Sequence, residues 1–167
     1  MSKKSLVEFQ IGVYFYMRLK TYCSGGENFM NSEELKAQII FSEGFDDSEQ
    51  GANLKINNPT LSISINNSEL PINFSVIVML FRLDYRKSHD LKIEIEDQDG
   101  TIVTKLEGKI PAIEKPKPGG LNVNINFSNV FFKKEGWHTA ILKIDDAFIA
   151  KQEIHVNFLN ENRKKEL

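Results

Sequence analysis

Two tyrosines near the start of the chain have the residue type and spacing that suit ligand binding. Tyr14 and Tyr16 lie in a segment, residues 9–20, in which apolar and polar residues alternate. Because side chains alternate between the two faces of a β-strand, a strand here places both rings on one nominally exposed face. Aromatic rings on such a face can stack against sugars or bases. The alternative is ordinary cross-strand packing, or cover by the helix predicted below.

The histidines and the cysteine show no spacing that is typical of a metal or catalytic site. No pair among His89, His138 and His155 falls at metal-ligand spacing. Cys23 is the single cysteine, which excludes an intramolecular disulfide and a cysteine-based zinc site within one chain. The chain around Cys23 is typical of a loop, with no distinctive nucleophile context.

A possible calcium loop at residues 97–100 fails on its later positions. The sequence there is DQDG, but position twelve of an EF-hand loop must be Glu and is Gly108 here. A plain hairpin turn is the better interpretation. Neither a nucleophile elbow nor a glycine-rich phosphate loop is present. We therefore predict a protein that is not an enzyme, with no catalytic residue, no metal and no cofactor.

Composition indicates one globular domain without a nucleic-acid or membrane partner. The chain has 167 residues, 41% hydrophobic content, twelve Phe and a formal net charge of −2, which is enough for one core and gives no basic surface. Glu8, Gln10 and Arg18 interrupt the first apolar stretch, and no run reaches the ~18 apolar residues of a membrane span. We predict a cytoplasmic domain over residues 1–160 and a charged tail over 161–167.

Alternation of apolar and polar residues is the main structural signal, and it predicts strands. It runs through residues 9–19, 61–65, 91–95 and 121–127. In the last of these Asn122, Asn124 and Asn126 alternate with apolar residues, so we expect the asparagines to face solvent. Residues 74–81 are apolar on both faces, which is typical of a central strand.

Turns and loops complete the β pattern. Residues 97–100 and the pair Asp145-Asp146 each separate two strand-like segments and predict hairpins. Two long loops are expected over residues 44–51 and 110–120, the second because it is rich in proline and glycine.

One helix is predicted, over residues 31–41. Asn31 can cap it, Glu34 occupies the capping-box position, and Leu35 with Ile39 forms an i, i+4 apolar pair. The predicted fold is thus all-β, a two-sheet antiparallel sandwich with one short helix.

The second half of the chain, from about residue 70 to residue 158, resembles a family of small bacterial and phage-associated proteins of unknown function. The segments that carry the resemblance are FSVIVML, LKIEIEDQDGTIV, EGWHTAILKID and FIAKQEIHV. The corresponding turn and core residues are Pro71, Asp97, Gly100, Gly136, Trp137, Leu142, Asp145 and Val156. The resemblance implies an immunoglobulin-like sandwich and supplies no catalytic residue. The first half departs from the family pattern.

Three functions are compatible with this sequence. The first is a non-catalytic protein-interaction or assembly module, encoded on a mobile element or phage, whose partner is another protein or a second copy of the chain. The second is a carbohydrate or small-ligand binder that uses Tyr14, Tyr16 or the 110–120 loop. The third is an enzyme whose site is assembled from dispersed carboxylates and histidines.

Overall fold

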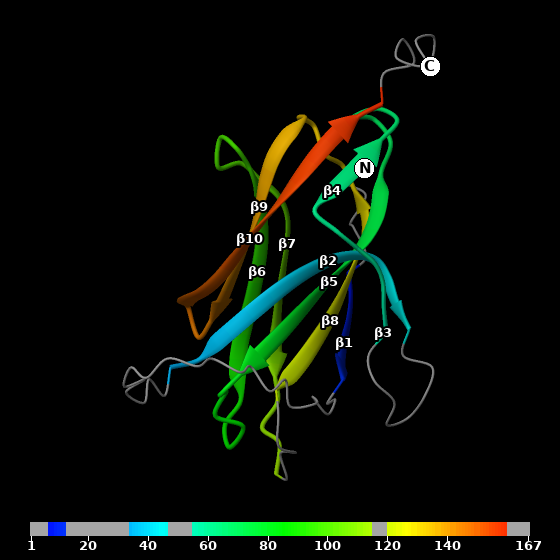
Figure 1. Ribbon diagram of the computed structural model, residues 1–167. Helices are drawn as coiled ribbons and strands as arrows, with labels where there is room; N and C mark the ends of the chain where they lie inside the picture. Colours follow the sequence, from blue (N-terminus) through cyan, green and yellow to red (C-terminus); the bar gives the residue numbers. More distant parts are fainter. Residues whose placement is uncertain (1–6, 13–33, 47–54, 115–119, 160–167) are drawn as a thin grey trace, which may run out of the picture.

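The computed structural model describes residues 7–12, 34–46, 55–114 and 120–159, and for residues 7–12, 45, 46 and 55 it describes the backbone alone. These parts of the chain form ten strands and no helix, arranged as two sheets packed face to face (Figure 1). Sheet A has the order β1-β8-β5-β2-β3 and sheet B the order β4-β10-β9-β6-β7. The strands are β1 (Val7–Gly12), β2 (Lys36–Asp46), β3 (Lys55–Thr60), β4 (Ser62–Ile65), β5 (Ile72–Phe81), β6 (His89–Asp97), β7 (Ile102–Ile110), β8 (Leu121–Val130), β9 (Gly136–Ile144) and β10 (Ala147–Phe158).

The core lies between the two sheets and is built from alternate residues of each strand. Val76 and Val78 of β5 face inward from sheet A, and Ile93 and Ile95 of β6 face them from sheet B. The prediction of a central strand over 74–81 is confirmed, because β5 hydrogen-bonds to β8 on one side and β2 on the other. The all-β, two-sheet prediction is also confirmed.

The prediction of a purely antiparallel sandwich is wrong, because sheet B is mixed. The chain leaves sheet A at Thr60 and enters sheet B at Ser62, where β4 pairs in parallel with β10. The Thr60 hydroxyl donates to the Ser62 carbonyl and accepts from the Ser62 N–H, which fixes the crossing point. A single extended segment therefore serves both sheets, and its direction matches that of β10.

The predicted helix over residues 31–41 is not seen. Residues 31–33 lie outside the described residues, and residues 36–46 form β2, which pairs with β5 and β3. Ile39 and Phe41 point into the core while Ile40 faces the other side, a period-two pattern. Local capping signals at Asn31 and Glu34 are outweighed because β-branched and aromatic residues gain more from pairing within a sheet.

The expectation that the asparagines of β8 face solvent is wrong at two positions. Asn122 and Asn124 are 1% and 0% exposed, and none of their amide atoms has a hydrogen-bond partner. Asn126 differs, because its side-chain oxygen accepts a hydrogen bond from Ser75 at 2.6 Å. Asn124 and Asn122 lie opposite Ile77 and Met79 of β5, which are also buried, so this face of sheet A is covered at these positions and the asparagines do not mark a solvent-exposed face.

Both predicted hairpins are present. Gly100, with φ of +77°, closes the β6–β7 turn, and its N–H donates to the Asp97 carbonyl at 2.9 Å. Asp145 and Asp146 join β9 to β10 with φ values of +51° and +63°, a conformation that Asp adopts more readily than most residues. The predicted strands at 61–65, 91–95 and 121–127 correspond to β4, β6 and β8.

The remaining predicted segments lie partly or wholly outside the described residues. Of the first predicted strand, β1 is described and residues 13–19 are not. The acidic loop predicted over 44–51 begins within β2 and then leaves the described residues at 47. The tail at 161–167 also lies outside them.

Candidate functional site

The predicted ligand-binding residues Tyr14 and Tyr16 lie outside the described residues. The clearest candidate surface among the described residues is the outer face of sheet B, on the side of the sheet away from the core. This face carries a band of charged residues and, beside the band, an exposed aromatic pair.

The charged band is a set of alternating acids and bases on β6, β7 and β9. Glu94 lies at its centre with only 7% of its side chain exposed, 2.9 Å from Lys92 Nζ and 3.2 Å from Lys143 Nζ. Hydrogen bonding to Lys92 and to Lys143 lowers the pKa of the Glu94 carboxyl, and burial opposes this shift. Glu107 extends the band toward the edge of the sheet, 3.2 Å from Lys105. Because the largely buried Glu94 carboxylate bonds to two lysines, the side chains in the middle of this face are held in one arrangement.

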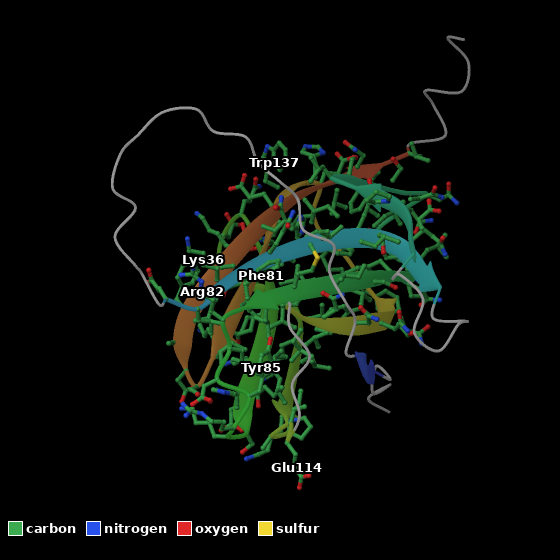
Figure 2. The ribbon with its side chains drawn as sticks, turned by 60° about the horizontal axis from the view of Figure 1, so that its bottom comes forward. Lys36, Phe81, Arg82, Tyr85, Glu114 and Trp137 are labelled. Carbon is green, nitrogen blue, oxygen red and sulfur yellow. The ribbon has the colours of Figure 1, made fainter. Side chains whose placement is uncertain are left out.

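The aromatic pair is formed by Trp137 of β9 and His155 of β10. The two residues lie opposite each other in the sheet register, and their rings meet edge to face with centroids 4.9 Å apart. The Trp137 side chain lies at the surface, at the opposite end of the view from Glu114, and the residue is 54% exposed (Figure 2). Leu61, 66% exposed, is adjacent, because its carbonyl accepts a hydrogen bond from the His155 N–H. Trp137 thus presents a large apolar ring on a rigid strand.

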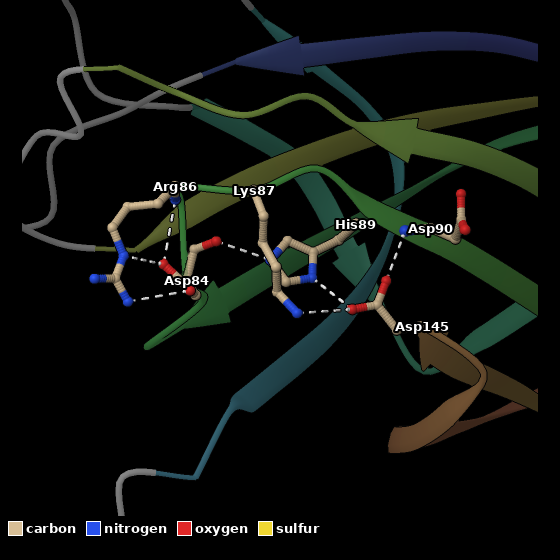
Figure 3. A network of polar contacts seen from close by, with 6 residues as sticks. All are labelled: Asp84, Arg86, Lys87, His89, Asp90 and Asp145. Atoms are coloured by element: carbon tan, nitrogen blue, oxygen red, sulfur yellow. Dashed lines mark hydrogen bonds and ion pairs between the residues drawn. The ribbon is translucent and has the colours of Figure 1, made fainter.

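A second cluster joins the β9–β10 turn to the start of β6 (Figure 3). Asp145 accepts hydrogen bonds from His89 Nδ1 at 2.8 Å and from the Asp90 N–H at 2.9 Å, and Lys87 Nζ lies 3.8 Å away. The bond from His89 is the main cause that lowers the pKa of Asp145. His89 Nε2 is 2.8 Å from the backbone carbonyl of Asp84. Both ring nitrogens of this buried histidine therefore lie within hydrogen-bond distance of an oxygen atom.

The other end of β6 carries a different arrangement. Asp97 accepts hydrogen bonds from Lys134 at 2.7 Å and from the N–H groups of Asp99 and Thr101, with Lys134 the main cause that lowers the Asp97 pKa to about 2. His138, opposite Asp97 in the register, is 1% exposed. Its Nδ1 lies 3.1 Å from the Gly136 carbonyl, and its Nε2 is buried without a partner. Burial is the main cause that lowers the pKa of His138.

Neither cluster has the composition of a metal site or a nucleophilic site. Among the described residues no group of three or more His, Cys, Asp and Glu side chains could hold a metal ion. The Asp145–His89 pair has the form of an acid–base dyad, but the Asp84 carbonyl occupies the position that a nucleophilic hydroxyl would need. The described part of the chain also contains no helix that could span a membrane.

Comparison of the sequence with protein families identifies one. The model of the "Family of unknown function (DUF6941)" matches residues 47–157, which is more than half of the chain. The chain belongs to the DUF6941 family. This confirms the resemblance to a family of unknown function, and the match begins earlier, at residue 47 rather than near residue 70. No curated protein matches the DUF6941 chain.

Three solved structures are similar to this DUF6941 member at low sequence identity. The alkylpurine DNA glycosylase AlkC of Pseudomonas fluorescens, bound to DNA with an abasic site analogue, is 8% identical, with a TM-score of 0.45 over 74% of this chain. A glycosyl hydrolase family 2 member from Bacteroides cellulosilyticus is 14% identical, with a TM-score of 0.42 over 63%. The chain spans 30% of the first protein and 16% of the second. An immunoglobulin-like protein from Pseudomonas aeruginosa is 14% identical, with a TM-score of 0.39, over 76% of this chain and all of that one.

Sequence reasoning named several of these residues but not their roles. The sequence predicts Asp97 and Asp145 as hairpin-turn residues and Trp137 as a turn or core position of the family pattern, yet Trp137 is exposed and Asp145 also binds His89. The alternation in β9 carried a usable signal, because Trp137 has the opposite parity to His138 and Ala140, which are buried. The pairing of Asp145 with His89 joins residues 56 apart, and no spacing rule connects them.

Proposed function

We propose that this DUF6941 domain is a non-catalytic module that binds another protein through the outer face of sheet B around Trp137. The observation that carries the proposal is the exposed indole of Trp137, held on a paired strand against His155. Tryptophan is among the residues that contribute most to protein–protein binding, because it buries a large area at little entropic cost.

The surroundings of Trp137 have the composition of an interface rim. Asn157 donates a hydrogen bond to the Ser62 hydroxyl at 2.9 Å, so polar groups with fixed geometry border the aromatic pair. Leu61 is exposed, its carbonyl accepts a hydrogen bond from the His155 N–H, and it adds apolar surface next to β10. An apolar centre with a polar margin is the usual arrangement of protein interfaces. The Asp84 carbonyl occupies the position beside His89 Nε2 that a catalytic hydroxyl would need, which supports a binding role over a catalytic one.

Carbohydrate binding is the second candidate, and Trp137 also favours it. An exposed indole bordered by hydrogen-bonding groups can stack against a sugar ring. In that case Trp137 would have the role that the sequence suggested for Tyr14 and Tyr16.

A competition experiment tests the proposal. Proteins retained by the immobilised domain are challenged with free wild-type domain, with Trp137→Ala or with Phe131→Ala, a matched change at another exposed aromatic. We expect the wild type and Phe131→Ala to displace the same protein and Trp137→Ala to fail. Because Trp137 is exposed, its removal should cost the fold only about 0.5 kcal/mol, which thermal denaturation checks.

Two outcomes would count against this function. If Trp137→Ala competes as well as the wild type, the surface is not the binding site. If a glycan array shows binding that Trp137→Ala abolishes, the carbohydrate alternative replaces the protein partner.

A further inference from the structure

We propose that two copies of this chain associate edge to edge, by antiparallel pairing of their β7 strands about a two-fold axis at Leu106. The partner is a second copy of the chain, and the two sheets B would join into one continuous sheet. This inference does not depend on the proposed function, because β9, which carries Trp137, is separated from β7 by β6.

The edges of the two sheets differ in how open they are to pairing with another chain. An unpaired edge strand presents free N–H and C=O groups, and proteins usually block it by making it short or by adding proline, bulges or charge. The edge strand β3 contains Pro59, and Asn58 beside it has φ of +47°. The edge strand β4 has four residues.

By contrast, β7 has nine residues and no proline, and no described strand pairs with its outer side. Its register with β6 is unbroken from His89↔Ile110 to Ile95↔Thr104 and shifts only beyond that stretch, between Ile95 and Glu96. Among the edges whose side chains are described, β7 is therefore the longest, and its stretch Thr104–Ile110 is regular and contains no proline.

The charged side chains of β7 favour one register of the pair. Lys105, Glu107 and Lys109 occupy alternate positions and have side chains that are 55%, 57% and 74% exposed. Leu106 is the midpoint of the strand, so antiparallel pairing about it aligns the regular stretch Thr104–Gly108 with itself. Lys105 then lies opposite Glu107 of the second copy, and Glu107 lies opposite its Lys105.

Two other registers of the β7–β7 pair are less favourable than the one centred on Leu106. Centring the axis on Glu107 would place the two Glu107 side chains opposite each other and Lys105 opposite Lys109, and like charges in that position repel. Centring it on Gly108 would bring Lys105 opposite Pro111, which lacks an N–H.

Charge reversal tests the pairing directly, with association measured by analytical ultracentrifugation. The wild type should show a concentration-dependent monomer–dimer equilibrium. Lys105→Glu leaves two acidic positions on the edge and Glu107→Lys leaves two basic ones, so each variant alone turns both cross-strand pairs into like charges. We expect each to weaken dimerisation by about tenfold or more. An equimolar mixture of the two variants should restore association, because every cross-strand pair is again of opposite charge.

Matched controls separate the edge from general charge effects and from the Trp137 surface. Lys36→Glu on β2 and Glu69→Lys before β5 make the same charge changes elsewhere on exposed residues, and both should dimerise like the wild type. Thermal denaturation confirms that each variant is folded. Trp137→Ala should also leave dimerisation unchanged.

Three results would overturn the inference. One is a wild-type protein that stays monomeric at its highest soluble concentration. Another is a mixture of the reversed variants that associates no better than either alone. The third is dimerisation that Trp137→Ala abolishes and the β7 reversals do not, which would place the dimer on the outer face and leave the proposed binding surface intact.

Discussion

A buried histidine lies at each end of β6, His89 as its first residue and His138 of β9 opposite its last residue, and the surroundings of the two differ. At the first residue of the strand, His89 places both ring nitrogens against acceptor oxygens of Asp84 and Asp145. At the other end, His138 lies across from Asp97 with an edge-to-face contact to Phe132 and one nitrogen unpartnered. His89 therefore has an oxygen atom beside each ring nitrogen, whereas burial with one nitrogen unpartnered lowers the pKa of His138. Two buried histidines on neighbouring strands thus differ in how fully their polar atoms are satisfied.

Removing the carboxylate of Asp145 should have the largest effect on this contrast. Asp145→Ala leaves the buried His89 Nδ1 and the Asp90 N–H without their partner, and we expect a loss of about 2–3 kcal/mol in the free energy of unfolding. Asp146→Ala is the matched control, since Asp146 has a similar positive φ. It should cost about 1 kcal/mol. Urea denaturation measures the loss of stability in each variant. Equal losses would show that Asp145 contributes through the turn conformation and not through its hydrogen bonds to His89 and Asp90.

The pH dependence of unfolding should come in part from His138. Its pKa is lowered in the folded protein, so the unfolded chain binds more protons once the pH falls below the ordinary value of 6.5. Stability at this end is present above that pH and decreases as the pH falls toward the folded pKa. His138→Leu removes the titrating group and the unpartnered nitrogen, and at pH 7 it should change stability by no more than about 1 kcal/mol. Urea midpoints at pH 7 and pH 5 should differ less in the variant, and an unchanged difference would contradict the assignment.

The smallest effect is expected at Asp97, in strongly acid solution. Its folded pKa of about 2 lies below the ordinary 3.8, so its contribution is present above 3.8 and is lost as the pH falls toward 2. Lys134→Met removes the main cause of this shift and should move acid unfolding to a higher pH. Lys133→Met, at the next residue, is the control and should not. Acid titration followed by circular dichroism gives the midpoints, and coincident midpoints for the two variants would rule out the Lys134 contact as the cause.

Alternation and turn residues predicted most of sheet B correctly. The strand around 91–95, the Gly100 turn and the Asp145-Asp146 turn depend on neighbouring residues, so the sequence carries that information locally. The same holds for β8 of sheet A, which the alternation over 121–127 predicted. The helix prediction, whose residues 36–41 lie in β2, was wrong for the opposite reason. The helix signals of this segment are local, whereas its strand state depends on pairing with β5, which follows far along the chain.

The candidate site was less predictable than the fold. The alternation in β9 places Trp137 on the outer face, but the sequence does not show that Leu61 lies next to its partner His155. The parallel pairing of β4 with β10 joins residues more than ninety positions apart, such as Ser62 and His155. Long-range contacts of this kind decide which residues of a sandwich lie side by side, and the alternation within one strand gives no information about them.

The crossing of the chain from sheet A to sheet B at Leu61 also determines how the domain bears a mechanical load. Because β4 and β10 run in parallel, a pull applied to the chain before β4 and after β10 acts along both strands in opposite directions. The hydrogen bonds between them are then loaded together in shear and must break as a group. Antiparallel neighbours pulled from adjacent ends would instead unzip one bond at a time.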